Sequence, residues 1–246
     1  MQSSPDRPIR LARFMALAGV ASRRKSEAMI ERGLVEVDGH LVTTPAFNVI
    51  PGRQEVRVEG RRIELPSRWT YLAVYKPRGY VSTSSDPQGR PTALDLVETG
   101  GRRLFIVGRL DLGSEGLLVL TDDGSWAQSL LHPSRGHLRT YRVAVPGRVS
   151  PEKRRALLEG VELADGPARA QAVRTESVGR ERGLTWLEIE LSEGRNRQIR
   201  RMLGAVGLEV SRLIRTRMGP IRLGELKPGQ WRPLAEGEIQ AVERGE

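Results

Sequence analysis

The chain has 246 residues, and its composition is that of a folded globular protein. Glycine and proline contribute 27 plus 15 residues, about 17% of the chain, which is below the level that favours disorder or a fibrous repeat. The net charge is +10, and since only four of the 40 basic residues are lysines, arginine carries it. Guanidinium groups bind phosphate oxygens in pairs, so this charge favours a phosphate-bearing partner. The lack of cysteine excludes disulfides, and three histidines without cysteine exclude a Cys/His zinc site.

The start of the chain superficially resembles a secretion signal, because Arg10 and Arg13 precede the apolar run Phe14 to Ala21. That run has only eight residues, and Arg23-Arg24-Lys25 follow it closely. No apolar stretch approaches the ~18 residues that a membrane span needs. We therefore expect a soluble, cytoplasmic monomer with no membrane partner. At about 150 residues per domain, the length predicts one medium domain and one small one.

The first seventy residues predict two short helices followed by a hairpin. The first helix is indicated by apolar residues at three- and four-residue spacing, which are Leu11, Phe14, Met15 and Ala18. A second helix is predicted to begin after Ser22, a plausible N-cap, and to stop at Gly33. Val35–Val37 and Leu41–Val42 then flank Asp38-Gly39-His40, which is the turn chemistry of a short hairpin.

Three cations, Arg23, Arg24 and Lys25, would occupy the first turn of the second helix, where the helix dipole is already positive. This arrangement disfavours the isolated helix but creates a site where free amide groups and cations converge on an anion. We predict that a nucleic-acid phosphate binds there. Three solvated cations on a surface turn are the alternative.

These residues resemble the S4 RNA-binding domain over roughly residues 9–56. The resemblance is carried by Arg10-Leu11-Ala12-Arg13-Phe14, Gly19-Val20-Ala21-Ser22-Arg23-Arg24 and Gly33-x-Val35-x-Val37-Asp38-Gly39. It implies a helix-helix-hairpin fold that docks on structured RNA through its two helices. The implied RNA-binding residues are Arg10, Arg13, Arg23, Arg24 and Lys25. We place an S4 domain at residues 1–65 and interpret Leu65–Arg68 as a linker.

Residues 69–246 predict a second domain of strands interleaved with short helices, an α+β fold with a mostly antiparallel mixed sheet flanked by helices. The expected strands are Tyr71–Tyr75, Phe105–Val107, Leu117–Leu120 and the alternating stretch Leu187–Leu191. The expected helices are Trp126–Leu131, one that starts at Pro151 after Ser150, and Ile199–Val206 before Gly207.

A loop with three glycines and two carboxylates, Gly108 to Gly116, lies between two of these apolar strands. Loops pinned by strands often carry catalytic side chains. The carboxylate of Asp111 could attack or stabilise an electrophilic sugar carbon. In the alternative interpretation, Asp111 only forms an ion pair with neighbouring Arg109.

Two further features accompany this loop. Tyr141 enters a strand, where its ring could stack on a base, although a core tyrosine is the default. Seven arginines and one acid, Glu209, lie between residues 195 and 217. Arg197, Arg200 and Arg201 would share a helix face distinct from that of the apolar residues, so the core explains only the apolar half and the basic face needs another partner.

Together these segments resemble the pseudouridine synthase family whose members carry an N-terminal S4 domain. The matching elements are Gly108-Arg109-Leu110-Asp111, Ser114-Glu115-Gly116-Leu117-Leu118, Thr140-Tyr141 and Gln198-Ile199-Arg200. The resemblance spans nearly the whole chain except about the last dozen residues. The run from Gly194 to Met202 and the closing Leu226-x-x-Gly229-x-Trp231-Arg232-x-Leu234 resemble the family's large-subunit branch most. Arg139 and Met218 depart from its pattern, which commonly has a lysine and an aromatic residue there.

The resemblance implies isomerisation of uridine to pseudouridine in ribosomal RNA, most of all 23S rRNA, with base flipping and without metal or cofactor. Asp111 would be the essential carboxylate, by nucleophilic attack or by promoting elimination. Tyr141 would stack on the base and assist proton removal from carbon 5, and Arg200 would pair with Asp111. The implied RNA-binding residues of this domain are Arg109, Arg195, Arg197, Arg201, Arg212 and Arg215.

Three alternatives remain open from the sequence. The chain could be a non-catalytic RNA-binding ribosome-assembly factor, or a synthase that acts on small-subunit rRNA. A phosphatase or nuclease that uses Asp122 and Asp123 is the third, although Asp-Asp-Gly is more often a turn.

Overall fold

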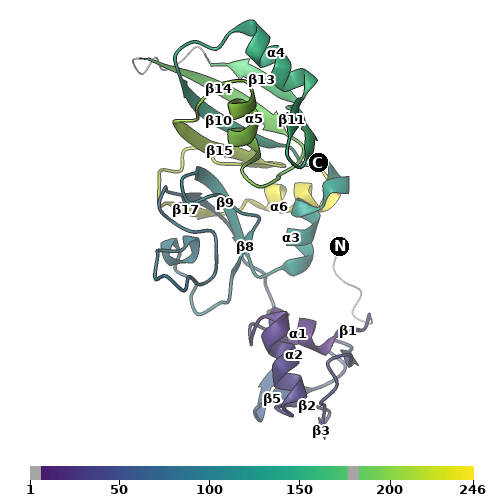
Figure 1. Cartoon of the computed structure of the whole chain (residues 1–246). Helices are drawn as coiled ribbons and strands as arrows, with labels where there is room; N and C mark the ends of the chain where they lie inside the picture. Colours follow the sequence, from purple (N-terminus) through teal and green to yellow (C-terminus); the bar gives the residue numbers. More distant parts are fainter. Residues whose placement is uncertain (1–6, 177–182) are drawn as a thin grey trace. The chain divides into compact units, whose positions relative to one another are not determined.

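The computed structural model describes residues 7–176 and 183–246, which form two compact units (Figure 1). The first contains the chain up to Thr70 with Thr99–Arg103 and Asp122–Gly124, and the second contains Tyr71–Glu98, Leu104–Thr121 and Ser125–Glu246. Within the described residues, no helix combines the length and apolar character needed to cross a membrane.

The first unit has the expected two helices and hairpin. Its helices are α1 (Leu11–Leu17) and α2 (Arg23–Glu31), and its strands are β1 (Ile9–Arg10), β2 (Val35–Val37), β3 (His40–Leu41), β4 (Asn48–Val49), β5 (Val56–Val58) and β6 (Arg61–Ile63). The strands β3-β2-β5-β6 form an antiparallel sheet in that order, and β1 pairs with β4.

Local chemistry explains where these elements start and turn. The Ser22 hydroxyl accepts a hydrogen bond from Lys25 N at 3.3 Å, so the expected N-cap of α2 is confirmed. Asp38 and Gly39 have φ of 50° and 77°, which is the backbone that a two-residue hairpin turn between β2 and β3 requires. A compact apolar core, which includes the fully buried Leu11 and Ile30, then holds both helices on the sheet.

The second unit is built on one nine-stranded sheet. Its strands are β7 (Tyr71–Lys76), β8 (Phe105–Val107), β9 (Glu115–Thr121), β10 (Arg139–Pro146), β13 (Ala172–Thr175), β14 (Leu184–Leu191), β15 (Arg212–Met218), β16 (Ile221–Arg222) and β17 (Trp231–Pro233). The order is β13-β14-β10-β15-β9-β7-β17, with β16 beside β15 and β8 beside β9. All pairings are antiparallel except β15 with β9. A separate hairpin joins β11 (Val161–Leu163) to β12 (Gly166–Ala168).

Helices cover both faces of this sheet. They are α3 (Gly124–Leu131), α4 (Pro151–Glu159), α5 (Gln198–Ala205) and α6 (Glu236–Arg244), with 3-10 turns at Ala93–Leu96 and Pro133–Arg135. Leu157 of α4 and Leu203 of α5 pack in the core of one face, as Figure 1 shows for α5 against β10, β14 and β15. Trp126 of α3 and Val242 of α6 pack in the core of the other face. The expected mixed, mostly antiparallel α+β architecture is confirmed.

A β-bulge in β15 interrupts the alternation of its side chains. Tyr141 pairs with Arg215 and Thr140 pairs with Arg217, so Thr216 is an extra residue on β15. Without the bulge, residues 215 and 217 would point to the same face. With it, Arg215 lines a cavity on one face of the sheet and Arg217 lines a hollow on the other.

Candidate active site

A cavity of about 450 Å³ lies beside the junction of β9 and β15. The predicted catalytic residues Asp111 and Tyr141 both line it, although 30 residues separate them in the chain. The arginine-rich segment around α5 contributes residues Glu193–Ile199, and β15 contributes Arg215. The three segments singled out by the sequence therefore meet in one place.

The backbone on either side of Asp111 is held by hydrogen bonds from distant segments. The Ser82 hydroxyl donates to Leu110 O at 2.8 Å and accepts from Leu110 N at 3.1 Å. Gly79 N donates to Leu112 O at 2.9 Å, on the other side of the carboxylate. Both neighbours of Asp111 are thus fixed, which restricts the positions that its carboxylate can take. Ser82 was not among the predicted site residues, because no local pattern indicates that it reaches a loop 28 residues away.

Arg215 connects the two ends of the same loop. It is 2% exposed, and its guanidinium donates from Nε to Leu117 O at 2.8 Å and from Nη1 to Arg109 O at 3.3 Å. Its Nη2 is buried and has no hydrogen-bond partner within the described structure, while the residue lines the cavity. Arg215 was predicted to bind RNA; the structure buries it in the wall of the cavity.

The β9–β15 junction is as close as it is because residue 116 is glycine. Gly116 has φ of 104°, and a Cβ there would lie 2.4 Å from Arg215 O. Contacts that short do not occur between real atoms, so any side chain at this position would push the two strands apart.

Arg200 does not form the expected ion pair with Asp111 among the contacts that the structure describes. Its guanidinium donates to Val210 O at 3.1 Å and to Gly113 O at 3.2 Å, in the loop that carries Asp111. Burial and the charge of Arg197 lower the pKa of Arg200, while the charge of Asp111 raises it. Arg200 therefore interacts with the carboxylate at longer range and supports the backbone that holds it.

A carboxylate clamp lies at the end of this loop, where β9 begins. The side chain of Glu115 is 5% exposed, and Arg212 donates to its two oxygens at 2.7 and 3.1 Å. The Tyr75 hydroxyl adds a hydrogen bond at 3.1 Å. Burial alone would raise the pKa of Glu115, but the hydrogen bonds and charge of Arg212 outweigh it and hold that pKa below its ordinary value. The clamp ties the first residue of β9 to the first residue of β15.

Lys76, the last residue of β7, is a buried cation that was not among the predicted site residues. Its side chain is fully buried, and its Nζ donates to Pro77 O and Tyr80 O at 2.8 Å each. Burial lowers the pKa of Lys76 to about 8, against the opposing charges of Glu115 and Asp111. The available signal was a lysine that ends an otherwise apolar strand.

Two further residues of the cavity wall, His137 and Arg139, were not among the predicted site residues. Burial lowers the pKa of both side chains, so neutral histidine is favoured at position 137. Arg139 precedes the Thr140-Tyr141 pair and places a guanidinium at the same cavity as Tyr141.

Several predicted RNA-binding arginines have partners inside the chain. Arg201 donates to both carboxylate oxygens of Asp165 at 2.7 and 2.9 Å, so this residue of the basic face of α5 has a partner within the chain. Arg195 donates to the carbonyls of Asp165, Gly166 and Pro167. Arg10 donates to Ala46 O.

Other predicted RNA contacts are exposed and available for RNA. In the first unit these are Arg23, Arg24 and Lys25 at the start of α2. In the second unit, Arg109 and Arg197 are exposed at the rim of the cavity. Arg13 lies on α1 and takes part in an interaction within the chain.

Asp122 is buried and accepts a hydrogen bond from Thr70 N at 2.6 Å and one from Arg102 Nη1 at 3.3 Å. These contacts give Asp122 a structural role. They favour the interpretation of Asp122-Asp123-Gly124 as a turn over a catalytic pair of carboxylates.

Two known protein families match the sequence of this chain. The model of the RNA pseudouridylate synthase family matches residues 70–205, and the S4 domain model matches residues 9–55. The chain belongs to the RNA pseudouridylate synthase family. Members of this family are isomerases, and the resemblance deduced from the sequence motifs is confirmed.

Relatives match over nearly the whole chain. An uncharacterized RNA pseudouridine synthase of Mycobacterium tuberculosis is 45% identical over 241 residues, which cover 97% of this chain and 94% of that protein. Ribosomal large subunit pseudouridine synthase B of Salmonella typhi is 43% identical over 232 residues, which cover 92% of this chain and 79% of that protein. A crystal structure of a pseudouridylate synthase has 28% identity and a TM-score of 0.66, covering 95% of this chain and 99% of that one.

Proposed function

We propose that the chain converts a uridine of large-subunit ribosomal RNA into pseudouridine in the cavity that Asp111 and Tyr141 line. The observation that carries this proposal is the convergence of the two side chains on one cavity of about 450 Å³, a volume in the usual range for a small-molecule or nucleoside site. The name of the Salmonella relative, ribosomal large subunit pseudouridine synthase B at 43% identity, supports the choice of RNA.

The reaction rearranges one nucleoside without net gain or loss of atoms. The bond between ribose C1′ and base N1 breaks, the base turns, and a bond forms between C1′ and C5. The proton on C5 leaves, and N1 gains one. Asp111 acts on the ribose side of this exchange, either by attack on the sugar or by promoting elimination. Tyr141 stacks on the base and assists removal of the C5 proton.

The target uridine has to leave its stack to reach the cavity, which costs a few kcal/mol. Cations at the rim compensate by binding the flanking phosphates, and Arg109 and Arg197 are exposed there. The hydrogen bonds that fix Leu110 and Leu112 hold Asp111 in place before the base arrives, so little reorganisation is needed in the reaction.

The test replaces Asp111 by asparagine, with Glu159→Gln as a control. Glu159 is an exposed carboxylate at the end of α4 that pairs with Arg155, so the control makes the same carboxylate-to-amide change away from the cavity. We expect Asp111→Asn to abolish pseudouridine in rRNA from a deletion strain complemented with the variant, while the purified variant still binds RNA. Glu159→Gln should modify normally.

Equal pseudouridine from Asp111→Asn and the unaltered chain would remove Asp111 from the mechanism. Mapping the modified uridines with and without the protein tests the choice of RNA. A modification that appears only in small-subunit rRNA would overturn that choice and leave the isomerase reaction standing.

A further inference from the structure

A second hollow, of about 670 Å³, lies on the face of the large sheet opposite the cavity of Asp111. The alternation of side chains along β10 shows this, because Tyr141 lines the first cavity and its neighbours Thr140 and Arg142 line the second. The reaction described above uses no residue of this hollow.

Strand register arranges the floor of the hollow in rows. Thr140 of β10 lies directly between Glu190 of β14 and Arg217 of β15, and Arg217 lies directly opposite Arg222 of β16. Directly paired residues share a face, so these four side chains form one row across four strands.

The acidic end of this row is already neutralised. Arg174 donates to Glu188 at 2.9 Å and to Glu190 at 3.2 Å. Arg142, which also lines the hollow, is held by Glu176 at 2.7 Å. The carboxylates on this side therefore have their cations within the chain.

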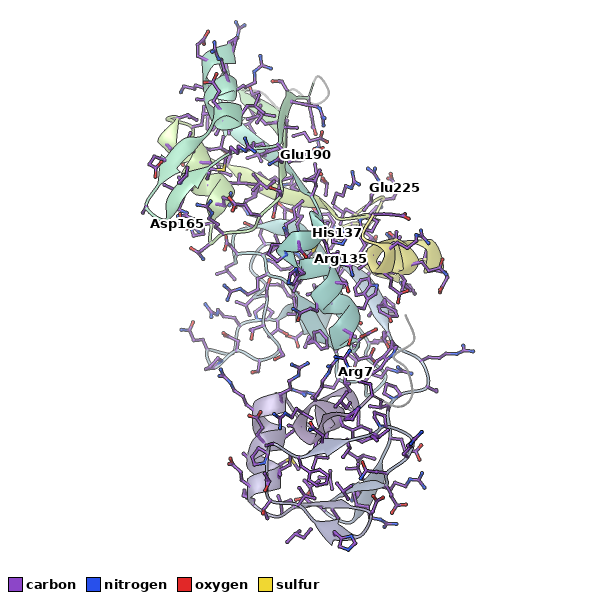
Figure 2. The ribbon with its side chains drawn as sticks, turned by 90° about the vertical axis from the view of Figure 1, so that its right-hand side faces the viewer. Arg7, Arg135, His137, Asp165, Glu190 and Glu225 are labelled. Carbon is purple, nitrogen blue, oxygen red and sulfur yellow. The ribbon has the colours of Figure 1, made fainter. Side chains whose placement is uncertain are left out.

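The opposite end carries two arginines with no such compensation. Arg217 and Arg222 face each other as a cross-strand pair, and like charges in that position destabilise a sheet. Within the described residues, neither guanidinium forms an ion pair with a carboxylate, and Arg217 donates its Nε to Gly219 O at 2.7 Å. Figure 2 labels Glu190 on β14, and it also labels Glu225, which is exposed on the loop after β16.

Between the two ends lies an unsatisfied polar atom. Thr140 is 4% exposed, and its Oγ1 is buried without a hydrogen-bond partner in the described structure. An unpaired buried hydroxyl destabilises the fold, so a ligand oxygen that accepts its hydrogen bond would recover that cost. The guanidinium pair and the hydroxyl lie next to each other in the row.

We propose that Arg217, Arg222 and Thr140 form a phosphate-binding site on the far side of the sheet from Asp111. A phosphate carries several acceptor oxygens and a negative charge, so it offsets the repulsion between the two guanidinium groups and accepts the threonine hydroxyl. The RNA backbone is the source of phosphate that fits a chain with a net charge of +10. The RNA would then contact both faces of the sheet. The RNA source rests on the proposed function; the phosphate site itself does not.

The first experiment measures thermal unfolding of the full chain in inorganic phosphate and in chloride at equal ionic strength. Arg222→Gln removes one member of the arginine pair, and Arg148→Gln makes the same change at an exposed position outside the hollow. We expect phosphate to raise the melting temperature of the unaltered chain and of Arg148→Gln, and to give a smaller rise in Arg222→Gln and Thr140→Val. In chloride, Arg222→Gln should be at least as stable as the unaltered chain, because it relieves the repulsion.

The second experiment measures binding to transcribed large-subunit rRNA as a function of salt. Loss of one phosphate contact should lower the slope of log affinity against log salt by ~0.7–0.9 in Arg222→Gln and leave it unchanged in Arg148→Gln. An unchanged slope with a reduced phosphate response would support the site and overturn RNA as its source. Equal phosphate responses in the unaltered chain and Arg222→Gln would overturn the site. Pseudouridine formation by the unaltered chain and by Arg222→Gln is assayed in parallel. Pseudouridine formed by both proteins together with equal phosphate responses would overturn the phosphate site and leave the proposed function standing.

Discussion

The substitution Gly116→Ala tests whether the contact between β9 and β15 positions the loop of Asp111. The added Cβ would lie 2.4 Å from Arg215 O and 2.7 Å from Arg215 N, and both are backbone atoms of a buried strand. Neither atom can move aside as the end of a flexible side chain would. The residue also has φ of 104°, a conformation that alanine adopts only with strain.

The expected loss combines two costs. Left-handed backbone for a non-glycine residue costs about 1–2 kcal/mol, and overpacking a tight core costs about 1–3 kcal/mol. Their central sum, ~3.5 kcal/mol, corresponds to a fall in melting temperature of about 7–14 °C for a chain of this size. Activity should fall further than stability, because separation of the strands displaces Arg215 and the loop together.

Calorimetry and a pseudouridine assay below the melting temperature measure the two effects. Gly113→Ala is the control, since its Cβ would meet nothing closer than the Arg200 Nη2 at 3.9 Å. A Gly116→Ala protein that melts with the unaltered chain and retains its turnover would refute the argument from the strand contact.

Two further predictions address the support of the loop. Ser82→Ala removes both hydrogen bonds to Leu110, so we expect kcat to fall about 10- to 100-fold with little change in KM, and threonine at position 82 to restore part of it. The control Ser129→Ala, on α3, should change neither kcat nor KM. A loss confined to KM would argue against a positioning role for Ser82. Because Arg212 holds the pKa of Glu115 below its ordinary 4.5, the ionised pair stabilises the fold above that pH and its contribution is lost as the pH falls through the lower folded value. Glu115→Gln should thus destabilise most near neutral pH, and a destabilisation of equal size at about pH 3, measured by thermal unfolding, would contradict this reasoning.

The sequence by itself determined the local elements. The cap at Ser22, the Asp38-Gly39 turn and the helix start at Pro151 all depend on side-chain chemistry within a few residues, and the structure has each of them. The motif around Asp111 also indicated the family, because all its residues lie in one continuous segment of the chain and can be recognised without knowing the fold. The catalytic roles of Asp111 and Tyr141 stay predictions.

Only the tertiary structure decided which partners the arginines have. Arg201 meets Asp165 from 36 residues away, and Arg200 meets the backbone at Gly113 from 87 residues away. Alternation along β15 would place Arg215 and Arg217 on one face, but the bulge at Thr216 separates them onto two. Such contacts depend on strand register and on the packing of distant segments, which no periodicity within one segment encodes.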